Sequence, residues 1–130
     1  MKEKTMYLKM KKEFPNVHLQ RIESNISVGI PDVAYAVNST KVGWIELKQV
    51  KNFSKKGIVK VPFRPGQLAW IKDYRKYSQR VFLFMHIKNI LFVFKGEDIL
   101  ASYSVHNISK YSCYYTSWNN VHWVEILSLL

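Results

Sequence analysis

The order of strand and helix patterns in the middle of the chain constrains its fold most strongly. Val42 to Val50 has the composition of a strand, Arg64 to Tyr77 carries apolar residues at helical spacing, and Val81 to Ile87 is a continuous apolar run of strand length. A strand, a helix and a second strand in this order predict a crossover between strands of one sheet. We therefore expect an α/β fold with a mixed central β-sheet flanked by helices.

Weaker patterns before and after this crossover predict the remaining elements. They are a helix over Glu3 to Phe14, strands over His18 to Glu23, Asp32 to Val37 and Ile90 to Phe94, a basic connection over Lys51 to Pro62, and a short helix over Glu97 to Ser102. The aromatic segment from Tyr111 to Trp123 is ambiguous, and Val121 to Leu130 fits either a strand or a final helix. A chain of 130 residues suits one domain, and we expect residues 1–130 to form it.

The charge of the chain points to an anionic partner. Twenty Lys and Arg face nine Asp and Glu, which gives a formal net charge of +11. A small basic domain usually binds a polyanion, and nucleic acid is the first candidate. An anionic membrane surface and a merely solubilising surface are the alternatives. The longest apolar stretches are too short to span a bilayer, so no membrane segment is expected.

The cysteine content and the N-terminus bear on where the protein works. Cys113 is the single cysteine, so neither an intramolecular disulfide nor a cysteine-based zinc site can form within one chain. Met1 to Lys12 is charged throughout and lacks the apolar core of a signal peptide. These features predict residence in the cytoplasm.

One apolar strand carries two charged residues at its centre. Side chains alternate along a strand, so Glu46 and Lys48 share one face, and the apolar Ile45 and Leu47 share the other. Charged groups are poorly placed in such a strand unless they are paired or bind a metal. An ion pair between Glu46 and Lys48 on a half-exposed face is the structural alternative.

A second carboxylate precedes this strand. Asp32 opens the preceding strand, and a turn over residues 38–40 returns the chain beside it, which brings Asp32 toward Glu46. Two carboxylates so placed suit a hard divalent cation such as Mg²⁺. A lysine next to them can stabilise charge that develops on a phosphate. The arrangement supplies the groups that phosphodiester hydrolysis requires.

The helix predicted after the basic connection has one polar residue on its otherwise apolar face. Gln67 shares that face with Trp70, Ile71 and Tyr74, at the spacings i, i+3, i+4 and i+7. A Gln on the side that faces the sheet needs a hydrogen-bond partner. The groups around Asp32 could provide one, and the backbone is the alternative.

These residues resemble the PD-(D/E)XK nuclease superfamily. Within it, the chain is similar to small phage-type nucleases of the VRR-NUC and Holliday-junction-resolvase-like groups. In those groups a GxPD sequence is followed by a strand that ends in ExK and by a helix that bears a Gln. Gly29-Ile30-Pro31-Asp32, Glu46-Leu47-Lys48 and Gln67 match that order, and the resemblance extends over roughly residues 3–94. The core of the family is a mixed sheet flanked by helices.

The resemblance assigns roles to the matching residues. It implies that Asp32, Glu46, Lys48 and Gln67 are catalytic. It also implies that Asp32 and Glu46 bind Mg²⁺, with Mn²⁺ as a substitute, together with the backbone carbonyl of Leu47.

Nucleases of this family often add an acid from the first helix. Glu3 is our first choice as a further metal ligand, because on a helix it shares a face with Met6, Tyr7 and Met10. Glu23 and Glu13 are alternatives, and a first-turn Glu that stabilises the helix dipole is the structural explanation.

Positive charge follows the ExK strand directly. Five basic residues, whose expected role is to hold DNA phosphates, lie in or next to the connection: Lys51, Lys55, Lys56, Lys60 and Arg64. The aromatic residues between Tyr111 and Trp123 could stack on bases, but core packing or a subunit contact fits them better.

The resemblance implies a metal-dependent endonuclease that hydrolyses DNA phosphodiester bonds. We expect selectivity for branched or Holliday-junction DNA, and a homodimer, because small resolvases make paired cuts. A phage-encoded protein that acts in the host cell is part of the same expectation. A site-specific duplex endonuclease of the homing or restriction kind and a non-catalytic nucleic-acid-binding module are the alternatives.

Overall fold

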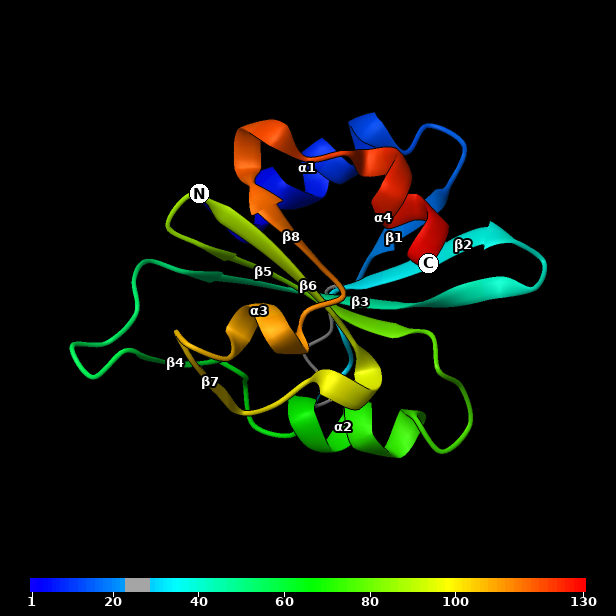
Figure 1. The fold of residues 1–130 in the computed structure, drawn as a ribbon. Helices are drawn as coiled ribbons and strands as arrows, with labels where there is room; N and C mark the ends of the chain where they lie inside the picture. Colours follow the sequence, from blue (N-terminus) through cyan, green and yellow to red (C-terminus); the bar gives the residue numbers. More distant parts are fainter. Residues whose placement is uncertain (23–28) are drawn as a thin grey trace.

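The computed structural model describes residues 1–22 and 29–130, and a six-stranded mixed β-sheet lies at its centre (Figure 1). The strands of this sheet are β1 (His18–Arg21), β2 (Val33–Asn38), β3 (Lys41–Val50), β5 (Val81–Ile87), β6 (Ile90–Lys95) and β8 (Tyr114–Ser117). They lie in the order β1-β2-β3-β5-β6-β8, and every neighbouring pair is antiparallel except β3 and β5, which are parallel. The predicted crossover and the predicted α/β class with a mixed central sheet are both confirmed.

Helices cover both faces of the sheet (Figure 1). The helical elements are α1 (Glu3–Glu13), α2 (Gln67–Tyr74), α3 (Ile108–Tyr111) and α4 (Trp123–Leu129), with 3-10 turns η1 (Gly96–Asp98) and η2 (Trp118–Asn120). α1 and α4 pack on one face, and α2 and α3 lie on the other beside a small second sheet of β4 (Ile58–Lys60) and β7 (Ser102–Ser104). Within the described residues, no helix has the length and apolar character needed to cross a membrane.

β5 shows why the central strands are apolar throughout. Phe82 and Phe84 pack with α1 and α4, whereas Leu83 and Met85 pack with α2 and the β4–β7 sheet. All four side chains are buried, because this strand lies inside the sheet and has helices over both faces. The continuous apolar run in the sequence is therefore the pattern of a strand covered on both sides.

Some predicted boundaries were wrong. The helix expected from Arg64 begins at Gln67, because Gly66 adopts a left-handed φ of 88° that a helix cannot continue through. The helix expected over residues 97–102 is a 3-10 turn that ends at Asp98, and Ser102 already belongs to β7.

The C-terminal segment resolves an ambiguity of the sequence. Residues 123–129 form the helix α4 rather than a strand. Trp123 is buried against Phe14 of α1, with ring centroids 5.5 Å apart, and belongs to the core. Tyr115 on the edge strand β8 is 55% exposed, so the aromatic segment is divided between core and surface.

Candidate functional site

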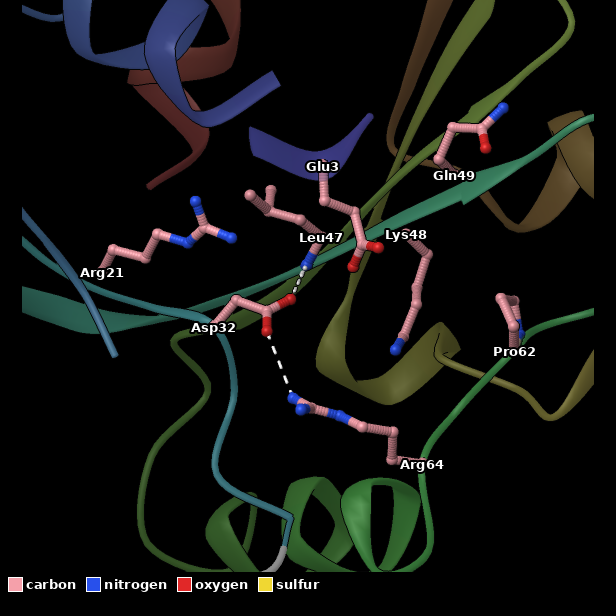
Figure 2. A pocket seen from close by; sticks show the side chains of 8 residues that line it. All are labelled: Glu3, Arg21, Asp32, Leu47, Lys48, Gln49, Pro62 and Arg64. Carbon is pink, nitrogen blue, oxygen red and sulfur yellow. Dashed lines mark hydrogen bonds and ion pairs between the residues drawn. The ribbon is translucent and has the colours of Figure 1, made fainter. Parts of the chain in front are cut away.

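A cavity of about 440 Å³ opens at the end of the sheet where β2 begins. It is lined by residues from α1, β1, β3 and the segments before β2 and α2: Glu3, Arg21, Asp32, Leu47, Lys48, Gln49, Pro62 and Arg64. In Figure 2 the charged ends of Glu3, Asp32, Lys48 and Arg64 point toward a common space. Asp32 and Lys48 of the predicted motif thus meet at one place with Glu3 and Arg64.

Asp32 occupies the point where the strand ladder between β2 and β3 stops. The last backbone pair of that ladder is Val33 with Ile45. The N–H of Leu47, the next group on that side of β3, donates a hydrogen bond of 3.0 Å to Oδ2 of Asp32. Because the N–H and C=O of one strand residue point the same way, the Leu47 carbonyl faces the same side as Asp32.

Glu46 and Lys48 share a face of β3, as predicted, and both are buried. Glu46 is 0% exposed and Lys48 is 5% exposed. Their neighbours across the parallel ladder are the apolar Leu83 and Met85. The Lys48 ammonium lies 5.8 Å from the centre of the Phe63 ring. Neither carboxylate oxygen of Glu46 has a hydrogen-bond partner within the described part of the chain.

The charged form of Glu46 is therefore destabilised. Burial is the main cause that raises the pKa of Glu46, and the nearby carboxylate of Asp32 raises it further, while Lys48 and Arg64 oppose the shift. A protonated Glu46 can donate a hydrogen bond to Asp32, but an ionised Glu46 finds no donor among the residues that the structure describes. The carboxylate needs either a proton or a cation, and the adjacent oxygens of Asp32 and the Leu47 carbonyl fit a hard divalent cation.

Glu46 does not itself line the cavity. The lining on this part of β3 consists of Leu47, Lys48 and Gln49, and Glu46 lies fully buried beside them. Its electrostatic interaction with Asp32 connects it with the charged groups of the cavity.

Two of the three acids considered for the first helix and its surroundings, Glu3 and Glu13, lie in the described residues, and of these Glu3 lines the cavity. Burial raises the pKa of Glu3, and the charge of Asp32 raises it further, while Lys48 lowers it. Glu13 pairs with Lys9 at 3.0 Å and does not line the cavity.

The third acid, Glu23, lies outside the described residues. Among residues 1–22 and 29–130, no three His, Cys, Asp or Glu side chains are grouped so that they could hold a metal ion. Glu3 thus reaches the cavity without forming a compact cluster of three acids with Asp32 and Glu46.

The glycine of the GxPD sequence, Gly29, lets the segment that leads to Asp32 pass close to the start of α2. Gly29 has a φ of 94°, and a Cβ at this position would lie 2.5 Å from the carbonyl oxygen of Gly66 and 3.2 Å from Cβ of Trp70. Only a residue without a side chain lets the chain pass this close to the start of α2. Gly29 therefore lets the segment that leads to Asp32 pass close to the start of the Gln67 helix.

Gln67 is fully buried but does not line the cavity. Its Oε1 accepts a hydrogen bond of 2.8 Å from the backbone N–H of Arg64, which is the backbone partner considered as an alternative. Its Nε2 has no partner among the described residues. The Arg64 side chain lies near Asp32, at 3.4 Å between Nη2 and Oδ1.

The other predicted phosphate contacts lie beyond the cavity. Lys51, Lys55, Lys56 and Lys60 are exposed on the segment after β3 and on β4, and none of them lines the cavity.

Three lining residues were not predicted as site residues: Arg21, Gln49 and Pro62. Arg21 reaches the cavity because it ends β1, which pairs with β2, and lies opposite Val33.

Neither a protein-family model nor a curated protein matches the sequence. The fold is similar to the solved structure of Hjc, a Holliday junction resolvase from the archaeal hyperthermophile Archaeoglobus fulgidus. The TM-score is 0.59 at 10% sequence identity, and the similarity covers 83% of this chain and 89% of that chain. At this identity the similarity shows a common fold.

Proposed function

We propose that the chain is a Mg²⁺-dependent endodeoxyribonuclease. The observation that carries the proposal is the fully buried carboxylate of Glu46, which has no hydrogen-bond donor among residues 1–22 and 29–130 and lies beside Asp32 and Lys48. A structural ion pair would explain Glu46 only if Lys48 donated to it, and no such hydrogen bond is made. A cation-binding role explains both the burial and the missing donor.

In this proposal Asp32 and Glu46 hold the cation with the Leu47 carbonyl, and Glu3 is a further ligand. The chemistry that such a cation would supply when bound is the acidification of a water molecule and the neutralisation of charge that builds on the phosphate. Lys48, whose ammonium points into the cavity, stabilises the negative charge of the phosphate in the transition state. The buried apolar residues behind β3 keep these side chains in place.

The same proposal gives the basic segment a role in binding DNA. Five residues would hold phosphates on either side of the cut: Lys51, Lys55, Lys56, Lys60 and Arg64. Contacts of this kind locate a strand and carry little sequence information. The archaeal structure with the similar fold is described as a Holliday junction resolvase, and this supports branched DNA as the substrate class.

Paired cuts in a branched molecule require two active sites, and the described residues of one chain form a single site of this kind. We therefore propose a homodimer. A phage-encoded protein that acts in the cytoplasm of the host is consistent with this activity and stays an expectation from the sequence.

A cleavage panel tests the proposal. Linear, nicked, flap and four-way DNA are incubated with Mg²⁺ or Mn²⁺, and with EDTA as the metal-free condition. Asp32→Asn and Glu46→Gln should each lose cleavage, whereas Glu13→Gln, a matched change of an acid outside the cavity, should retain it.

Two outcomes favour the alternatives. Tight DNA binding without cleavage in either metal would indicate a non-catalytic nucleic-acid-binding module. Cutting at one sequence in unbranched duplex would indicate a site-specific endonuclease of the homing or restriction kind.

A further inference from the structure

A positively charged side chain of the protein itself, that of Arg64, already pairs with one of the carboxylates of the cavity. The guanidinium of Arg64 is 3.4 Å from Oδ1 of Asp32, and the other oxygen of Asp32 accepts the Leu47 N–H. Figure 2 shows the Arg64 side chain extending across the cavity to reach Asp32. The Asp32 side chain is 18% exposed and the Arg64 side chain is 66% exposed. The pair therefore joins a largely buried acid, held by a backbone hydrogen bond, to a largely exposed arginine.

Gln67 holds the base of this arginine. Oε1 of Gln67 accepts the Arg64 backbone N–H at 2.8 Å, and the Gln67 backbone N–H donates to the Arg64 carbonyl at 3.1 Å. These two hydrogen bonds close the turn that begins α2, with Pro65 and Gly66 between them. Because Gln67 is fully buried, the turn is anchored to the core while the Arg64 side chain stays largely exposed.

Arg64 and a divalent cation would compete for Asp32. A Mg²⁺ ion approaches its oxygen ligands to about 2.0–2.1 Å, and a guanidinium on the same carboxylate opposes it by charge repulsion. An exposed arginine that is displaced from Asp32 remains tethered at the edge of the cavity by Gln67. The group best placed to receive it there is a DNA phosphate, which binds arginine in a two-point contact.

We infer that Arg64 is the resident counter-ion of Asp32 in the metal-free protein and transfers to the DNA phosphate when the cation binds. Gln67 acts as a positioning residue that keeps Arg64 within reach of both partners. This inference rests on the proposed nuclease function. It predicts that metal binding and DNA binding are coupled through Arg64.

Metal binding without DNA tests the first half of the inference. We would titrate Mn²⁺ into the wild type and Arg64→Gln by calorimetry, with Arg21→Gln as a control that removes an equal charge from the same cavity. Arg64→Gln should bind Mn²⁺ about two- to fivefold more tightly, because an exposed ion pair contributes only a small free energy. Arg21→Gln should show a smaller gain.

An equal gain in both variants, or no gain in Arg64→Gln, would overturn the competition for Asp32. A wild type that binds no divalent cation and cleaves no DNA would instead overturn the proposed function itself. A wild type that binds and cleaves, with Arg64→Gln unchanged in Mn²⁺ affinity, would overturn only this inference.

The salt dependence of DNA binding tests the second half. In a slow-cleaving Lys48→Ala background, Ca²⁺ should steepen the salt slope by about one, the signature of one added phosphate contact. The same slope should not respond to Ca²⁺ in Lys48→Ala/Arg64→Gln or in Lys48→Ala/Gln67→Ala.

A Gln67→Ala variant that keeps the full response to Ca²⁺ would overturn the positioning role, since a merely structural Gln leaves this linkage intact. Circular dichroism of each variant verifies that the fold is retained.

Discussion

The raised pKa of Glu46 should make the stability of the metal-free protein depend on pH. Its folded-state pKa lies above the ordinary value of 4.5, chiefly because the side chain is buried. The protonated form therefore stabilises the native state, fully below about pH 4.5 and progressively less as the pH rises through the raised pKa. We predict that the metal-free wild type loses thermal stability between pH 5 and pH 8. Glu46→Gln, with an uncharged amide, should show a flatter profile; an unchanged slope in this variant would contradict the assignment.

A divalent cation should reverse this loss. At pH 8, Mg²⁺ replaces the missing proton as the partner of Glu46, so it should raise the melting temperature of the wild type. The free energy of unfolding should rise by about 2.7 kcal/mol when the Mg²⁺ concentration is a hundred times its Kd. Glu46→Gln, measured by the same scan with and without EDTA, should lose most of the gain, whereas Glu13→Gln should keep it. An equal response in Glu46→Gln would place the cation elsewhere.

We predict that Lys48 acts in the chemistry of cleavage rather than in DNA binding. It is 5% exposed and one of many positive charges, so its loss should scarcely affect affinity. Lys48→Ala should lower the single-turnover rate at saturating DNA by roughly a hundredfold or more, the scale of removing one group that stabilises the transition state. Lys41→Ala, at the other end of β3, is the control. If Lys48→Ala weakened binding but kept its rate, Lys48 would be an ordinary phosphate contact.

The sequence predicted the residue-scale features that follow from strand alternation. Alternation alone placed Glu46 and Lys48 on one face, and the hairpin before them brought Asp32 close. The bonding of Gln67 to Arg64 was not predictable in this way, because it depends on the left-handed turn at Gly66. Arg21 reaches the cavity through the pairing of β1 with β2, and strand register between distant segments is not encoded in a local pattern.

At the scale of elements, long apolar patterns predicted the strands β3, β5 and β6 to within one or two residues. β4 and β7 were missed because each is three residues long and lies in a segment rich in Lys, Gly or Ser. Their pairing buries Val59 against the core together with Tyr103, which is a tertiary effect. Elements this short form because of their packing partners and not because of their own sequence.

The β4 region carries the lysines expected to bind DNA. We predict that a combined Lys55→Gln, Lys56→Gln and Lys60→Gln variant binds all DNA sequences more weakly. Its plot of log affinity against log salt should be shallower by about three, close to one for each phosphate contact removed. Titrations by fluorescence anisotropy at several salt concentrations measure the slope.

The matched control removes three lysines from elsewhere on the molecule: Lys11, Lys12 and Lys41. The first two lie on α1, which covers the opposite face of the sheet from β4. A slope that changes in the control and not in the β4 variant would place the DNA on the α1 face.

At the scale of the whole molecule, the expected substrate follows from what the fold leaves for recognition. The sheet, its two helical layers and the cavity occupy the described chain, and exposed lysines lie on the segment after β3 and on β4. Lysines and arginines read the position of the phosphate backbone, not the bases. Substrate choice should therefore depend on the shape of the DNA.

We predict that four-way junctions are cleaved in preference to linear duplex by a homodimer with two metal sites at a fixed separation. A symmetric dimer suits the symmetric strands of a junction, because each site can then cut one strand of an equivalent pair. Cleavage of a labelled junction should survive a large excess of unlabelled linear duplex, with cuts at fixed distances from the branch in any sequence. Sedimentation at the assay concentration should give the mass of two chains. Monomeric protein that cuts unbranched duplex equally well would contradict both the dimer and the choice of substrate, even if the metal site proves correct.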